Sequence, residues 1–175
     1  MNATPNCFAV IKHYESCRLV AYPDPKTGGA PYTIGWGATG QGIGSGVMWT
    51  QQQADDRLVA DVALRESDAN NAIRVEVTPG QFDAFVDALY NIGHGSPIKD
   101  GIVRLRNGNP STFLRMINGG NYLLARDALG QWVSPGTPVE HGLRRRRTAD
   151  QSLWDGDTAD VAIAKGDAAD RKSVV

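Results

Sequence analysis

Apolar positions with helical spacing dominate the chain from about residue 50 onward. The clearest helix is predicted to begin after Thr78, with Pro79 at its first position and Gln81 completing a capping box. Its apolar positions then follow three or four residues apart: Phe82, Phe85, Val86, Leu89 and Tyr90. This pattern predicts a core helix with one broad buried face.

Further helices are predicted by similar but shorter patterns. A second capping box, Thr50 with Gln53, opens a helix through about Ala69. Other candidates are residues 6–15, 110–118, 122–132 and 142–154. Beyond Gly156 the chain is rich in alanine and aspartate with weak periodicity. We therefore expect one domain over residues 1–156, followed by a loosely attached helix or frayed tail over residues 157–175.

A turn-rich region near the N-terminus has strand character instead. The segment RLVAYPD is followed by the turn formers of PKTGGAP and then by YTIGWG. We interpret this as a small β-hairpin. The side chains of its second strand alternate between two faces. Tyr32, Ile34 and Trp36 should cover the helical body. The opposite face, which carries Thr33, Gly35 and Gly37, should line a cleft. The fold class is therefore α+β, with a mostly helical body, an N-terminal hairpin lobe and a cleft between them.

Composition and charge exclude several classes of protein. The 175 residues are 41% hydrophobic and 21% charged, which is typical of a globular protein. A formal net charge of -1 removes the electrostatic footprint of a dedicated nucleic-acid binder. We see no apolar stretch for stable membrane insertion and no signal peptide, so we expect the chain to start out in the cytoplasm. The two cysteines, Cys7 and Cys17, are expected to be free thiols, with Cys7 buried.

Two carboxyl groups near the predicted hairpin could perform glycoside hydrolysis. That reaction needs one protonated carboxyl group to assist the leaving oxygen and one ionised carboxylate to activate water or to bond to the sugar. Glu15 ends the first predicted helix, where the helix dipole favours the protonated form. Asp24 lies in the turn-rich segment, where water and backbone donors favour the ionised form, and the Thr33 hydroxyl could hold a water beside it. A Glu and an Asp at this spacing are also common as solvated surface groups.

The chain contains Glu15, eight intervening residues, Asp24 and then Thr33 within YTIGWG. This arrangement resembles the catalytic signature of T4-type phage lysozymes, glycoside hydrolase family 24. Three further segments also resemble that family: the AYPDP turn, the segment QFDAFVDALYNIG and the closing GLRRRRTADQSLWDG. The resemblance covers roughly residues 7 to 156. The resemblance implies a two-lobed lysozyme-like fold with Glu15 as proton donor, Asp24 as base or charge stabiliser and Thr33 positioning the hydrolytic water. Ala38 stands where T4-type members commonly have histidine, and three extra residues lengthen the turn before Thr33.

The same resemblance implies an endolysin that hydrolyses the β-1,4 bond between N-acetylmuramic acid and N-acetylglucosamine in peptidoglycan, without a cofactor. It suggests Thr39 and Tyr90 as saccharide contacts, although Tyr90 could equally be a core aromatic. We expect a monomer that accumulates in the host bacterial cytoplasm and acts on the wall from the periplasm, after a separate holin-type lysis protein opens the inner membrane. Inversion at the anomeric carbon would place the two carboxyl groups about 6.5 to 9.5 Å apart.

Other interpretations remain open from the sequence. A lytic transglycosylase would need the glutamate but not a water-activating Asp24 and Thr33, and a peptidoglycan-binding module would keep the cleft without its chemistry. A zinc amidase is disfavoured because no Cys or His pair has the spacing of a strong metal site. The arginine run at residues 144–147 could bind phosphates, anionic wall polymers or nucleic acid, but at this net charge a solvated or ion-paired helix face is favoured.

Overall fold

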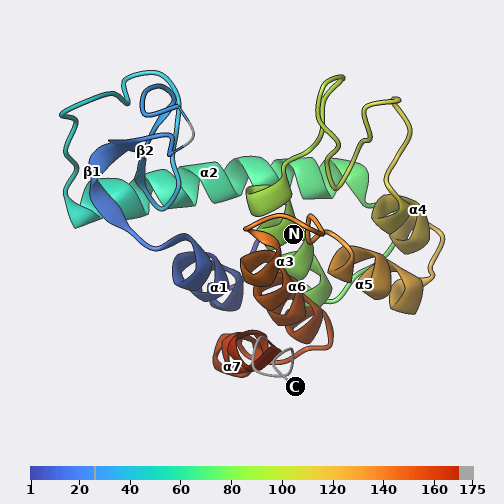
Figure 1. Ribbon diagram of the computed structural model, residues 1–175. Helices are drawn as coiled ribbons and strands as arrows, with labels where there is room; N and C mark the ends of the chain where they lie inside the picture. Colours follow the sequence, from blue (N-terminus) through green and yellow to red (C-terminus); the bar gives the residue numbers. More distant parts are fainter. Residues whose placement is uncertain (26, 170–175) are drawn as a thin grey trace.

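A computed structural model describes residues 1–25 and 27–169, and over these residues the chain forms seven helices and one two-stranded sheet (Figure 1). The α+β class expected from the sequence is confirmed. The helices are α1 (Pro5–Glu15), α2 (Gln51–Ala72), α3 (Pro79–Ile92), α4 (Thr112–Asn118), α5 (Tyr122–Gly130), α6 (Glu140–Trp154) and α7 (Ala159–Ala169). None of the helices described over these ranges combines the length and the apolar character needed to cross a membrane.

Helix α3 is the most buried helix, and α1, α2 and α6 all pack against it. Its Thr78 capping box is present as predicted, and so is the Thr50 capping box of α2. Both boxes satisfy backbone N–H groups that would otherwise lack partners at the helix start. The aromatic ring of Phe113 on α4 lies 4.8 Å from Phe85 and 5.9 Å from Trp154, which joins three helices in one core.

The hairpin consists of β1 (Arg18–Pro23) and β2 (Tyr32–Gly35), which pair antiparallel. It lies beside the N-terminal half of the long helix α2, apart from the other helices, as Figure 1 shows. The lobe and the helical body are therefore joined by α2 and by the short segment between α1 and β1. This is the two-lobed arrangement that the sequence predicted.

Several predicted helix ends shift in the structure. The helix expected from residue 110 begins at Thr112, because the Ser111 hydroxyl accepts a hydrogen bond from the Leu114 N–H and so caps the helix there. The helix expected over 122–132 ends at Gly130, the helix expected from Gly142 already begins at Glu140, and α2 continues to Ala72.

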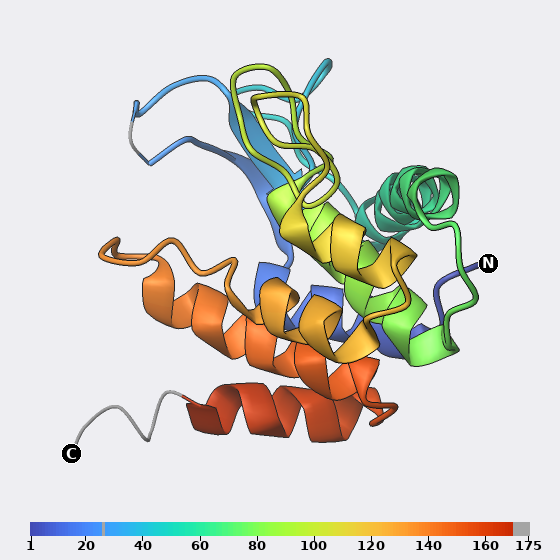
Figure 2. The same ribbon diagram turned by 90° about the vertical axis from the view of Figure 1, so that its right-hand side faces the viewer.

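The segment after Gly156 corrects one expectation. Residues 159–169 form α7, which runs along α6 and also contacts α1 (Figure 2). Ala159, Ala162 and Gly166 are buried in these contacts, so this helix is not loosely attached. Small residues on one face allow its close approach. The rest of the expected tail, residues 170–175, lies outside the described residues, and the division at residue 156 stays a prediction.

Candidate active site

Glu15 is the last residue of α1, at the point where the chain leaves the helical body for the hairpin. The helix begins with Thr4, whose hydroxyl accepts a hydrogen bond from the Asn6 N–H, and with Pro5 at its first position. The residue after the helix is Ser16, whose φ of 56° takes the backbone out of the helical region. The Glu15 side chain keeps 21% of its surface exposed, so a substrate can reach it.

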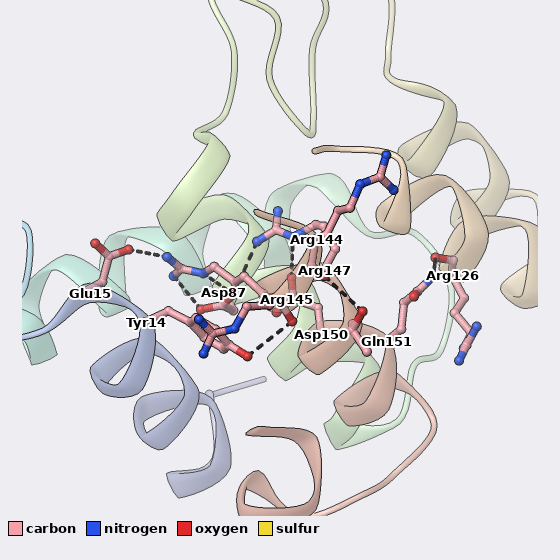
Figure 3. Close-up of polar contacts among 11 residues, drawn as sticks. Tyr14, Glu15, Asp87, Arg126, Arg144, Arg145, Arg147, Asp150 and Gln151 are labelled. Carbon is pink, nitrogen blue, oxygen red and sulfur yellow. Dashed lines mark hydrogen bonds and ion pairs between the residues drawn. The ribbon is translucent and has the colours of Figure 1, made fainter. Parts of the chain in front are cut away.

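The carboxylate of Glu15 is held by Arg146 on α6 (Figure 3). Arg146 Nη1 donates to Glu15 Oε1, while Arg146 Nε and Nη2 donate to Asp87 on α3 at 2.9 and 2.7 Å. The Arg146 side chain is 4% exposed and Asp87 is fully buried. Neither residue was predicted as part of the site from the sequence. One available signal was Asp87 itself, because a carboxylate within an apolar helix face requires a buried cationic partner.

Asp24 lies just after β1, opposite Pro31. Its backbone N–H donates to the carbonyl oxygens of Pro31 and Gly29 at 3.1 and 3.0 Å. The first of these bonds continues the register that pairs Tyr22 with Thr33, so Asp24 and Thr33 lie on the same face of the hairpin, diagonally across the two strands. Both residues are half-buried. The structure thus brings these two predicted residues together.

The turn after β2 joins this hairpin face to Glu15. The backbone groups of Ile34 and Ala38 bond to each other at 2.9 Å in both directions, which folds residues 35–37 into a tight turn. Gly37 there has a φ of 96°, and a Cβ on it would lie 3.1 Å from Glu15 Oε2. Gly37 therefore faces Glu15.

Gly35 corrects the expectation that this residue lines a cleft. It is buried, and a Cβ added to it would meet the ring of Trp49 at 3.1 Å and Ala54 of α2 at 3.3 Å. The strict alternation predicted from YTIGWG stops at this residue because the turn begins there. Gly35 thus lets the hairpin pack on α2 and does not line the cleft.

The two predicted saccharide contacts have structural partners. The Tyr90 hydroxyl donates to the Trp36 carbonyl oxygen at 2.7 Å and so connects α3 to the turn after β2. Burial and then the nearby charge of Glu15 raise the pKa of Tyr90, which keeps this hydroxyl a donor. Thr39 is exposed, and its carbonyl oxygen accepts from Arg57 of α2 at 3.2 Å.

A pocket of about 470 Å³ lies beside Glu15, between α1, α3 and α6. Asn91 and Leu143 line it, and they also line a second pocket of about 380 Å³ that continues toward the loop after α5. Polar groups of Glu15, Asn91 and Arg146 face the first pocket together with the aliphatic Leu143. This mixture suits a carbohydrate, which presents both hydroxyl groups and apolar ring faces. Asp24 and Thr33 are not among the residues that line these two pockets.

The arginine run is an ion-paired face in which two members are buried. Arg144 is exposed and pairs with Glu140 within α6, whereas Arg145 pairs with Asp167 of α7. Arg146 and Arg147, at 4% and 1% side-chain exposure, are not solvated. The run therefore forms ion pairs in the interior of the protein as well as at its surface.

Cys7 is buried and Cys17 half-buried, and both are free thiols as expected. Over residues 1–25 and 27–169, His, Cys, Asp and Glu side chains nowhere form a group of three that could hold a metal ion.

The sequence of this chain matches a known protein family and known relatives. A family model described as Phage lysozyme matches residues 12–150. An endolysin of Bacillus phage PZA is 34% identical over 149 residues, which cover 85% of this chain and 53% of that protein. The chain spans about half the length of the first curated relatives it matches.

Solved structures show the same fold. The endolysin from Escherichia coli O157:H7 phage FAHEc1 is 29% identical, with a TM-score of 0.72 that covers 90% of this chain and 96% of that one. The muramidase domain of SpmX from Asticaccaulis excentricus is 26% identical, with a TM-score of 0.70 over 87% of this chain and 97% of that one.

Proposed function

Because this chain belongs to the phage lysozyme family, we propose that it is an endolysin that acts as a muramidase on bacterial peptidoglycan. It would hydrolyse the β-1,4 bond between N-acetylmuramic acid and N-acetylglucosamine, the reaction of lysozyme. The observation that carries this proposal is Glu15, a partly exposed carboxyl group fixed by Arg146 beside a pocket. The names of the relatives, endolysin and muramidase domain, support the same substrate.

In this proposal Glu15 donates a proton to the leaving oxygen of the glycosidic bond. Asp24 activates the attacking water or stabilises the developing charge on the sugar, and Thr33 holds that water. The shared hairpin face of Asp24 and Thr33 supports this pairing of roles. The reaction would invert the anomeric carbon, for which the Glu15 and Asp24 carboxyl groups should lie about 6.5 to 9.5 Å apart to leave room for the water.

The proposal extends to partners and location. We expect a monomer whose substrate is the glycan strand, with Thr39 and Tyr90 as saccharide contacts and no cofactor. The protein would accumulate in the host cytoplasm and reach the periplasm through a lesion made by a separate holin-type protein. Product formation when purified protein is added to isolated sacculi tests the enzymatic part without these partners.

The test compares the wild-type protein with Glu15→Gln and with the control Glu76→Gln, which changes an exposed glutamate in the loop before α3. We expect Glu15→Gln to lower the release of soluble fragments from sacculi at least about 100-fold, because the amide cannot donate the proton. Glu76→Gln should keep wild-type activity. Near-wild-type activity of Glu15→Gln would refute the assignment of the acid.

Mass spectrometry of the products decides the reaction class. Reducing N-acetylmuramic acid ends support the muramidase. Anhydro ends would indicate a lytic transglycosylase, released peptides an amidase, and binding without soluble fragments a wall-binding module. Each of these three results would overturn the proposed reaction.

A further inference from the structure

Four ionisable side chains lie buried behind Glu15, and we call them the buried charge cluster: Asp87, Arg146, Arg147 and Asp150. Asp87 lies between the two guanidinium groups, with Arg146 Nη2 at 2.7 Å and Arg147 Nη2 at 3.6 Å. Arg147 Nε lies 2.8 Å from Asp150 Oδ2. Both aspartates are fully buried, so solvent does not screen this cluster.

The pKa values of the two aspartates in this cluster shift in opposite directions. Burial raises the pKa of Asp150 well above its usual value, and its neighbour Asp87 adds to that rise. Burial also acts on Asp87, but the charge and hydrogen bonds of Arg146 outweigh it and lower the pKa of Asp87. These shifts favour the ionised form of Asp87 and the protonated form of Asp150.

The geometry of Arg146 connects this cluster to Glu15. Two of its nitrogen atoms donate to the two oxygen atoms of Asp87, which fixes the plane of the guanidinium group. Only the remaining nitrogen, Nη1, donates to Glu15. Asp87 thus sets the direction of this bond, and its negative charge offsets part of the positive charge that Arg146 presents to Glu15.

We propose that Asp87 is a positioning residue for the reaction: it orients Arg146 toward Glu15 and offsets part of the positive charge that Arg146 presents to Glu15. This inference rests on the proposed function, because it assumes that Glu15 is the proton donor. Without Asp87, the Arg146 charge would face Glu15 with less compensation. Glu15 would then lose its proton, and its activity as an acid, at lower pH.

The groups that face Asp87 from other helices leave this argument intact. From α1, Cys7 and Tyr14 lie near it, and burial is the main cause that raises the pKa of each, so both stay neutral near neutral pH. From α6 it faces Arg146, Arg147 and Asp150, the other members of the buried charge cluster. Asp87, whose lowered pKa favours its ionised form, is therefore the main negative group opposite the two arginines.

The groups around Glu15 are Arg146 from α6 and Tyr90 from α3, whose hydroxyl stays neutral. The pocket also places His13 on α1 and Arg145 on α6 near it, and both interact with Asp167 of α7. Asp24 is the second carboxyl group of the proposed reaction. Among these groups, Arg146 is the one that Asp87 contacts directly.

The experiment measures kcat/KM for fragment release from sacculi as a function of pH, for the wild-type protein, Asp87→Asn and the control Asp83→Asn. Asp83 is a buried carboxyl group one helical turn earlier on α3, bonded to Thr4 and not to Arg146. For Asp87→Asn we expect the alkaline limb of the profile to move to lower pH by about one unit. Asp83→Asn should keep the limb in its wild-type position, even if its stability falls.

Three outcomes separate the possibilities. A uniform loss of activity in Asp87→Asn, with the limb unmoved, would show a merely structural role and overturn the inference. A wild-type protein that releases no reducing ends would instead refute the proposed function. If Asp87→Asn does not fold, Asp87→Ser makes the same change of charge and leaves space for a water, and its limb must move in the same direction.

Discussion

Gly37 is the position at which the hairpin lobe meets the proposed acid, and a single methyl group there tests the geometry of the site. In Gly37→Ala the added carbon would lie 3.1 Å from Glu15 Oε2, tighter than an ordinary contact. Either the turn or the carboxyl group must then move by a few tenths of an ångström. The carboxyl group is held by Arg146, so the contact strains the link on which proton transfer depends.

Two effects can be estimated separately. The φ of 96° is unfavourable for alanine and should lower the free energy of unfolding by about 1–2 kcal/mol. A displacement of 1 Å in a catalytic group can cost about 100-fold in rate, so a few tenths of an ångström should lower kcat/KM about tenfold. The second effect is expected only if Glu15 takes part in the reaction.

The assay measures kcat/KM on isolated sacculi and the melting temperature in parallel, with Gly40→Ala as the control. Gly40 lies in the same loop and also has a left-handed φ, 114°, but no atom lies within 4 Å of an added Cβ. Both variants should lose stability, and Gly37→Ala alone should lose activity at temperatures where both are folded. Equal activity of the two variants would refute the argument that Gly37 protects the space beside Glu15.

Two further predictions concern stability. The raised pKa of Asp150 contributes stability that is fully present below the unfolded pKa of about 3.9 and is lost as pH rises toward the folded pKa. The asparagine in Asp150→Asn does not titrate, so its contribution does not change with pH. Calorimetry should therefore show the melting temperature of Asp150→Asn rising relative to that of the wild type as pH increases above about 4. A difference that does not change with pH would contradict the protonated state of Asp150. In Gly166→Ala the added Cβ would lie 2.2 Å from the Tyr14 hydroxyl and 2.6 Å from the Arg145 carbonyl oxygen. Overpacking of about 1–3 kcal/mol should exceed the helix preference of alanine, about 1 kcal/mol, and lower the melting temperature by about 2–4 °C, whereas an unchanged or higher value would show that α7 can shift without cost.

Much of the fold could be predicted because its signals are local. The Thr50 and Thr78 capping boxes each involve residues only three apart, and the hairpin follows from turn formers between two short strands. The position of Glu15 at a helix end was predicted in the same way. These features depend on residues that are close together in the sequence, so the sequence pattern predicts them.

The partners of Glu15 could not be predicted, because they depend on contacts between distant residues. Arg146 is 131 positions away from Glu15 and 59 from Asp87. Four consecutive arginines have the same local pattern whether they face water or the core, and only the packing of α6 on α3 buries Arg146 and Arg147. The burial of Gly35 was missed for a similar reason, because the strand pattern does not show that α2 packs against it.

The contacts of the two halves of the site differ in kind. Glu15 is fixed to the helical body by Arg146, which is itself held by the fully buried Asp87. Asp24 and Thr33 belong to a two-stranded hairpin, which a few hydrogen bonds connect to the body, among them that from the Tyr90 hydroxyl. Any movement of the hairpin lobe therefore changes the separation of the two proposed catalytic carboxyl groups and leaves the bond between Glu15 and Arg146 intact. In the proposed reaction the proton donor is therefore held by the helical body, whereas the residues on the water side are held by the hairpin.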